Sequence, residues 1–117
     1  MKSLAIAGLG LLLSSSVAGL SFAAETTVTG HLRDSFCYVI LGAQGPSHQK
    51  CAIACAKNGI SVALVQSGTD KTFILLPPKN ARPLPDSVID KMENEVTVTG
   101  DEYTKGGVTY LTVKSVK

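Results

Sequence analysis

Short stretches of alternating apolar and polar residues, separated by turn residues, are the feature that most constrains the fold of this chain. A period of two predicts β-strands with one face buried and the other in solvent. The sequence predicts five strands, at Thr26–Phe36, Ile60–Gln66, Thr72–Leu76, Glu95–Gly100 and Val108–Lys117. Glycine-containing turns at Ser67–Asp70 and Lys105–Gly107 predict that the second and third strands, and the fourth and fifth, form hairpins.

The alternation in the first strand also predicts which side chains face the core. The inner face is predicted to carry Val28, Leu32 and Phe36. Gly30 lies on the same face, at a position where a barrel strand commonly bends or bulges. His31 and Arg33 lie on the outer face, and we expect both side chains to be solvated.

Two segments are predicted to be helices rather than strands. Ser47 is a suitable N-cap for a helix that runs to about Asn58, and Gly59 is a suitable C′ residue. The helix is rich in alanine, so it can pack closely against a sheet. A second, short helix is predicted over Asp86–Met92, after Pro85.

The order of these elements predicts a mostly β fold. It is a small five-stranded OB-like barrel with a helical insert after strand 1 and a short helix between strands 3 and 4. The closing segment, EVTVTG…KGGVTYLTV, resembles the final hairpin of small exported bacterial OB-fold proteins. The resemblance implies a fold and an exported location. It does not imply a function, because OB-folds serve many functions.

The first 23 residues have the three zones of a secretory signal peptide. Lys2 supplies positive charge, Leu4–Leu13 is apolar, and Ser21–Ala23 ends in the small residues that signal peptidase prefers. We therefore predict a signal peptide over residues 1–23 and a single OB-like domain over residues 24–117, in the periplasm or secreted. A retained membrane anchor is the alternative, but the Ser- and Gly-rich second half suits a spanning helix poorly.

Charge and composition exclude several function classes. Without Lys2, ten basic residues remain of the eleven in the chain, against nine acidic ones. This balance provides no basic surface for nucleic acid, and the few aromatic residues provide no platform for stacking bases. No pair of carboxylates is placed for acid–base catalysis, so the sequence indicates no enzyme. After signal cleavage, no segment is long and apolar enough to cross a membrane.

The cysteines are the most informative residues for function. Cys37, Cys51 and Cys55 lie within 19 residues of sequence, and His48 lies among them. On a helix, positions 48, 51 and 55 fall within about 60° of one another. The loop before the helix is long enough to bring Cys37 over this stripe. Cys37, His48, Cys51 and Cys55 would then form a tetrahedral Cys₃His site, which suits a transition metal ion such as zinc or copper.

Asp34 is a further candidate at this site, because it precedes Cys37 by three residues. Its carboxylate could orient a metal-bound His48 by accepting a hydrogen bond from the imidazole. The alternative is that Asp34 is an ordinary turn residue at the end of a strand.

Two other interpretations of the cysteines stay open. Cys37 could pair with Cys51 or Cys55 in a disulfide worth about 3 kcal/mol, which would staple a module that binds an envelope protein or polymer. A Cys51–Cys55 bridge within one helix is disfavoured by its geometry. The third interpretation is thiol redox chemistry that starts at Cys51, close to the helix N-terminus.

Overall fold

The structure is a computed structural model that describes Gly8, Gly10 and residues 23–117. The predicted signal peptide therefore lies outside the described residues, apart from these two glycines and Ala23, and it stays a prediction. None of the helices in the described part of the chain is both long and apolar enough to cross a membrane.

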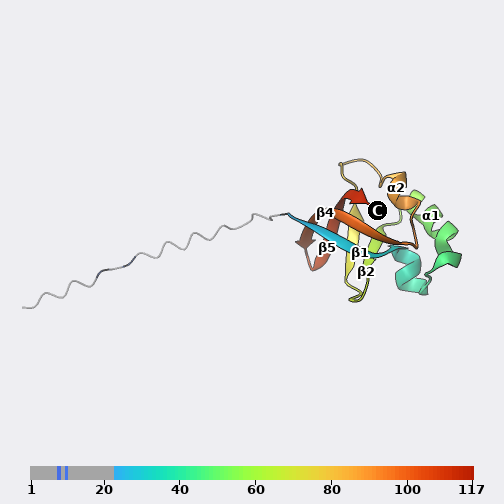
Figure 1. The fold of residues 1–117 in the computed structure, drawn as a ribbon, viewed down its shortest axis with the longest axis horizontal. Helices are drawn as coiled ribbons and strands as arrows, with labels where there is room; N and C mark the ends of the chain where they lie inside the picture. Colours follow the sequence, from blue (N-terminus) through green and yellow to red (C-terminus); the bar gives the residue numbers. More distant parts are fainter. Residues whose placement is uncertain (1–7, 9, 11–22) are drawn as a thin grey trace, which may run out of the picture.

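The fold is a closed five-stranded barrel, as the sequence predicts (Figure 1). Its strands are β1 (Ala24–Asp34), β2 (Val62–Gln66), β3 (Thr72–Leu76), β4 (Glu95–Lys105) and β5 (Val108–Val116). They follow the order β1-β2-β3-β5-β4 around the barrel. The β3–β5 pair is parallel, and the other four pairs are antiparallel. This closure leaves no long strand edge unpaired, which suits a small domain.

Strand β1 is long because it pairs with two neighbours in turn. Its first part, Ala24–His31, pairs with β4, and its second part, Gly30–Asp34, pairs with β2. At Gly30 the strands approach so closely that a Cβ atom would lie 2.2 Å from the carbonyl oxygen of Val65. Glycine is therefore required where β1 passes from one partner to the other.

The inner face of β1 agrees with the predicted alternation, with one correction. Val28 and Leu32 are buried. Phe36, which the alternation places inside, is 54% exposed, because the strand ends at Asp34 and the chain turns away. Asp34 continues the inward series and is fully buried, although it carries a carboxylate.

Helices cover one end of the barrel and extend its core. Helix α1 (Gln49–Lys57) contributes Ala52 and Ala56, and α2 (Asp86–Ile89) contributes two apolar residues. They join a cluster with the buried side chains of the strands, among them Leu32, Leu64, Val98 and Leu111. The small alanine side chains allow α1 to lie close to the barrel, which fixes the position of its cysteines.

The helical insert after β1 begins differently from the prediction. A π-helical turn, η1 (Cys37–Leu41), and a 3₁₀ turn, η2 (Pro46–His48), precede α1. Ser47 is not the N-cap, because Pro46 has already started the 3₁₀ turn and α1 begins at Gln49 without a side-chain cap.

The C-terminus of α1 confirms the role predicted for Gly59. This residue has a φ of +93°, and its N–H donates to Ala56 while the N–H of Ile60 donates to Cys55. This pair of hydrogen bonds is a Schellman motif. It ends α1 just beyond Cys55, and so fixes the last turn of the helix on which this cysteine lies.

Candidate metal centre at the start of the helical insert

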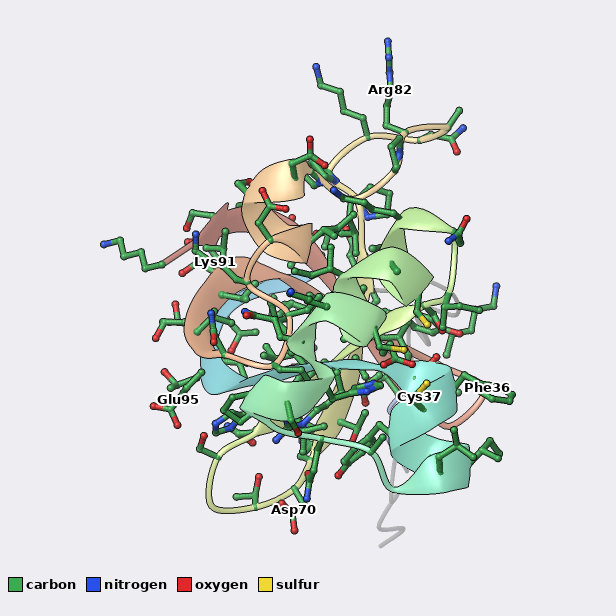
Figure 2. All side chains as sticks on the ribbon, turned by 90° about the vertical axis from the view of Figure 1, so that its right-hand side faces the viewer. Phe36, Cys37, Asp70, Arg82, Lys91 and Glu95 are labelled. Carbon is green, nitrogen blue, oxygen red and sulfur yellow. The ribbon has the colours of Figure 1, made fainter. Side chains whose placement is uncertain are left out.

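The three cysteine sulfurs lie together beside the end of β1. They are all within 4.8 Å of one another, and no two of them are bonded. Cys37 begins η1, Cys51 lies in the first turn of α1, and Cys55 lies one turn later. In Figure 2, yellow sulfur atoms gather next to the labelled Cys37. The convergence of the three thiols that the sequence predicts is thus present in the fold.

The three thiols differ strongly in their access to solvent. Cys37 is buried, with 7% of its surface exposed, Cys55 is intermediate, and Cys51 is exposed. The cluster therefore reaches the surface at Cys51 and the protein interior at Cys37.

His48 lies in a second group, which shares Cys37 with the first. One donor atom each from Asp34, Cys37 and His48 lie within 4.8 Å of one another. Cys37 therefore links the imidazole to the other two sulfurs. The His48 side chain is only 13% exposed, and so it does not point into open water.

Asp34 orients both Cys37 and His48. One carboxylate oxygen, Oδ1, accepts a hydrogen bond from the backbone N–H of Cys37 at 2.8 Å. The other, Oδ2, lies 2.8 Å from Nε2 of His48. This contact fixes the imidazole ring and leaves Nδ1 as its second nitrogen. Asp34 thus makes the contact with His48 that was expected of an orienting carboxylate.

The alternation along β1 also predicts that Asp34 is buried, independently of its proximity to Cys37. Asp34 follows Leu32 by two residues, so it shares the inward phase of the strand. A carboxylate on the inner face of a strand requires buried partners, and here they are His48 and the Cys37 backbone.

Asp34 also contributes to the raised pKa values of two thiols, Cys37 and Cys55. A hydrogen bond between the Cys37 thiol and Asp34, together with burial, raises the pKa of Cys37 to about 12. Burial, followed by the charge of Asp34, raises the pKa of Cys55. Burial acts to raise the pKa of Asp34 as well, but hydrogen bonds from Cys37 and His48 outweigh it and hold this pKa below its usual value. Asp34 is therefore a negative charge beside the neutral thiols of Cys37 and Cys55, an arrangement that attracts a cation.

We expect Cys37 to be slow to alkylate in the reduced, metal-free protein. At pH 8, a thiol with a pKa of about 12 is roughly a thousand times less ionised than one at the usual 9.0. Iodoacetamide labelling followed by mass spectrometry should show Cys37 reacting at least about ten-fold more slowly than exposed Cys51. The Cys37 rate should still rise in proportion to hydroxide up to pH 10.

The variant Asp34→Asn provides the control for this experiment. It weakens the hydrogen bond of the Cys37 thiol and removes the negative charge beside it, and both the bond and the charge raise the Cys37 pKa. The Cys37 rate should therefore increase and begin to level off at lower pH. A wild-type Cys37 rate that reaches its plateau near pH 9 would show that Asp34 does not control this thiol.

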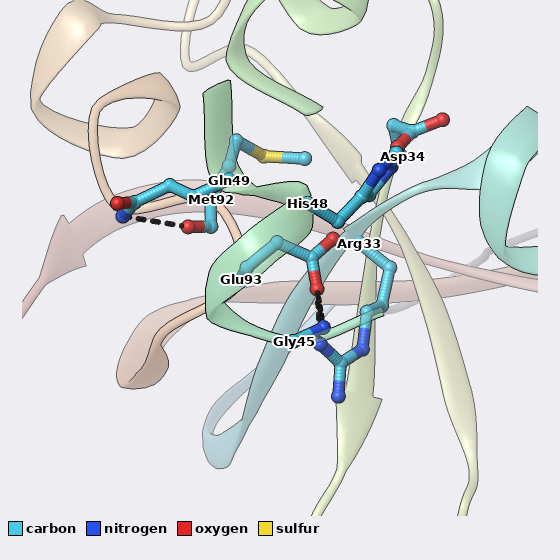
Figure 3. Close-up of polar contacts among 7 residues, drawn as sticks. All are labelled: Arg33, Asp34, Gly45, His48, Gln49, Met92 and Glu93. Atoms are coloured by element: carbon cyan, nitrogen blue, oxygen red, sulfur yellow. Dashed lines mark hydrogen bonds and ion pairs between the residues drawn. The ribbon is translucent and has the colours of Figure 1, made fainter. Parts of the chain in front are cut away.

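A buried ion pair fixes the loop that leads into α1. Arg33 and Glu93 form this pair, and the backbone N–H of Gly45 donates to the same Glu93 oxygen at 2.9 Å. Nearby, the side-chain amide of Gln49 donates to the carbonyl of Met92 at 3.1 Å (Figure 3). These contacts connect the insert to the segment before β4. Gly45 and Gln49 lie on either side of His48 in the sequence, so the contacts also restrict the position of His48.

The prediction that the Arg33 side chain is solvated is therefore wrong. Its side chain is 12% exposed, although it lies on the outer face of β1. The insert folds over this face and covers it, which alternation along a single strand cannot reveal.

His31, the other histidine of the chain, has a different environment. It lines a polar cavity of about 340 Å³ with Arg33, Tyr38 and Glu95 among its neighbours. Among the described residues, the groups that could hold a metal ion contain His48 and not His31. The geometry does not place His31 with the cysteines.

Comparisons with protein-family models, with curated proteins and with solved structures each found no match. The resemblance to small exported bacterial OB-fold proteins therefore stays a prediction. What is known about the site comes from its own residues and their geometry.

Proposed function

We propose that this chain is a small exported protein that binds a soft or borderline transition metal ion, copper or zinc. The ligands would be the thiolates of Cys37, Cys51 and Cys55 and the imidazole of His48. The observation that carries the proposal is the approach of three unpaired sulfurs to within 4.8 Å of one another.

The chemistry of the donor set supports this choice of metal. Thiolate and imidazole are the ligands that zinc and Cu(I) prefer, whereas magnesium and calcium prefer oxygen. Metal-bound histidines usually donate their other N–H to a carboxylate or carbonyl, and Asp34 is in contact with Nε2 of His48. Nδ1 would then be the atom that coordinates the metal. Binding would displace the thiol protons, at a cost that grows as the pH falls.

The exposure of Cys51 favours exchange of the metal over a purely structural role. A structural zinc site is usually closed, with all its ligands held inside the protein. Here one ligand lies at the surface, where the thiol or imidazole of another protein could replace it. We therefore propose sequestration or delivery in the periplasm or outside the cell, with an envelope protein as the partner.

Metal analysis of the protein purified from the periplasm tests this proposal. We expect about one copper or zinc ion per chain, and three free thiols after the metal is chelated and the protein is unfolded. A metal-free protein that has one disulfide and one free thiol, and that takes up no zinc after reduction, would contradict it.

That contrary result would support the second candidate, a disulfide-stapled interaction module without metal. The observation that favours this alternative is an exposed apolar surface at Phe36, Val39, Ile40 and Leu41, beside the cysteines. Exposed apolar side chains next to one another are typical of binding surfaces.

A further inference from the structure

We propose that the same three sulfurs, without a metal, exchange with small-molecule disulfides, accepting oxidation at Cys51 and retaining it as a Cys37–Cys55 disulfide. This activity shares its residues with the proposed metal site but does not require that a metal binds. It follows from the order in which the three thiols are exposed, from the proximity of their sulfurs and from the geometry of α1.

Cys51 is the point of entry, because it is the exposed member of the cluster. A disulfide molecule must bring one of its sulfurs into line with the attacking sulfur, so access decides which thiol reacts first. Cys37 is buried and lies behind the surface of the insert, while Cys55 is intermediate. The first bond to an external disulfide is therefore expected at Cys51.

Cys55 is the sulfur that links the other two. In exposure it stands between Cys51, which is exposed, and Cys37, which is buried, and it lies one helical turn after Cys51. All three sulfurs lie within 4.8 Å of one another, so a small rotation of the side chains brings a neighbouring pair to bonding distance. Oxidation can thus pass from Cys51 through Cys55 to Cys37.

The final bond is set by helix geometry. Residues four apart on a helix have Cα atoms about 6.2 Å apart, near the upper end of the range for disulfides, so a Cys51–Cys55 bond strains α1. Cys37 belongs to a separate segment and is free of this constraint. Exchange should therefore continue from Cys51–Cys55 to Cys37–Cys55.

The reaction balances in three exchanges. Cys51 attacks the external disulfide R–S–S–R, forms a mixed disulfide and releases the first R–SH. Cys55 attacks the sulfur of Cys51, forms Cys51–Cys55 and releases the second R–SH. Cys37 then attacks Cys55, forms Cys37–Cys55 and restores the Cys51 thiol. Overall, two protein thiols give two electrons and two protons to one external disulfide.

The oxidised state and the metal-bound state of the protein therefore exclude each other. The Cys37–Cys55 bond removes two of the three thiolates that would hold a metal. Oxidation would release the ion, and reduction would restore its site.

The test uses purified protein that has been reduced, freed of metal by a chelator and incubated with oxidised glutathione. Acid quenching, alkylation and tryptic digestion should then locate the bonds. Cleavage after Arg33, Lys50 and Lys57 places Cys37 on one peptide and the other two cysteines on a second. We expect the two peptides to be joined, with the alkyl group on Cys51.

Two variants test the order of the steps. Cys55→Ser should stop with glutathione on Cys51, and Cys51→Ser should oxidise at least about ten-fold more slowly than the wild type. A single wild-type peptide with a Cys51–Cys55 bond, stable glutathione on wild-type Cys51, or an unchanged rate in Cys51→Ser would overturn the proposal.

The experiment also separates this proposal from the proposed metal function. Zinc titration of the reduced protein reports on metal binding alone, and disulfide mapping in chelator reports on exchange alone. Zinc binding without Cys37–Cys55 formation would overturn only the exchange, and the reverse result would overturn only the metal site.

Discussion

Replacing Cys55 by serine is expected to lower the affinity for zinc by at least about a hundred-fold. Loss of a residue that merely orients a ligand costs about 10- to 100-fold in affinity, and loss of a ligand should cost more. Cys55 interacts with both other thiols, and a serine hydroxyl is a poor substitute for a thiolate. Competition with a chromophoric zinc chelator at pH 7.5, on the reduced protein, would measure this change.

A matched pair of histidine variants completes this test. His48→Gln should also weaken zinc binding, because it removes the only nitrogen donor of the predicted set. His31→Gln should leave the affinity unchanged, because His31 lies outside the groups that could hold a metal. Equal affinities for Cys55→Ser and the wild type would show that zinc, if bound, is held elsewhere.

The largest loss of stability is expected for Gly100→Ala, which should lower the free energy of unfolding by about 3 kcal/mol or more. Gly100 is buried in β4, at a register shift between β4 and β5. A Cβ atom there would lie 1.6 Å from the carbonyl oxygen of Thr112. Backbone, unlike a flexible side chain, can move aside only if the two strands separate. Urea unfolding followed by circular dichroism suits the test, because the chain has no Trp.

The control for this variant is Ser115→Ala, at an exposed position of the neighbouring strand β5. It should change the free energy of unfolding by no more than about 0.5 kcal/mol. If Gly100→Ala unfolded at the same urea concentration as this control, the close approach of β4 and β5 would not exist in solution.

The zinc-binding experiments depend on a site that the fold holds in place before any ligand binds. The insert is connected to the barrel by the buried Arg33–Glu93 pair, by Asp34 and by the alanine face of α1. A preorganised set of donors binds a metal without the cost of ordering the chain. These contacts explain how an inserted segment could serve as a binding site in a small domain.

Local patterns in the sequence determined the strands, the turns and the stripe that brings Cys51 and Cys55 together. A period of two or of 3.6 residues is a property of neighbouring residues, and so it can be read without knowing the fold. The barrel followed from the order of these elements. The C-terminus of α1 at Gly59 followed from the conformational freedom of glycine.

The contacts that complete the site depend on residues far apart in the chain. Tertiary structure turned Phe36 outward, buried Arg33 against Glu93, and placed His48 against Asp34. These outcomes depend on where β1 ends and on which segment covers its outer face. The sequence by itself therefore indicated which residues could form a site, and the tertiary structure decided how they are oriented, because burial and charge pairing arise between segments rather than within one.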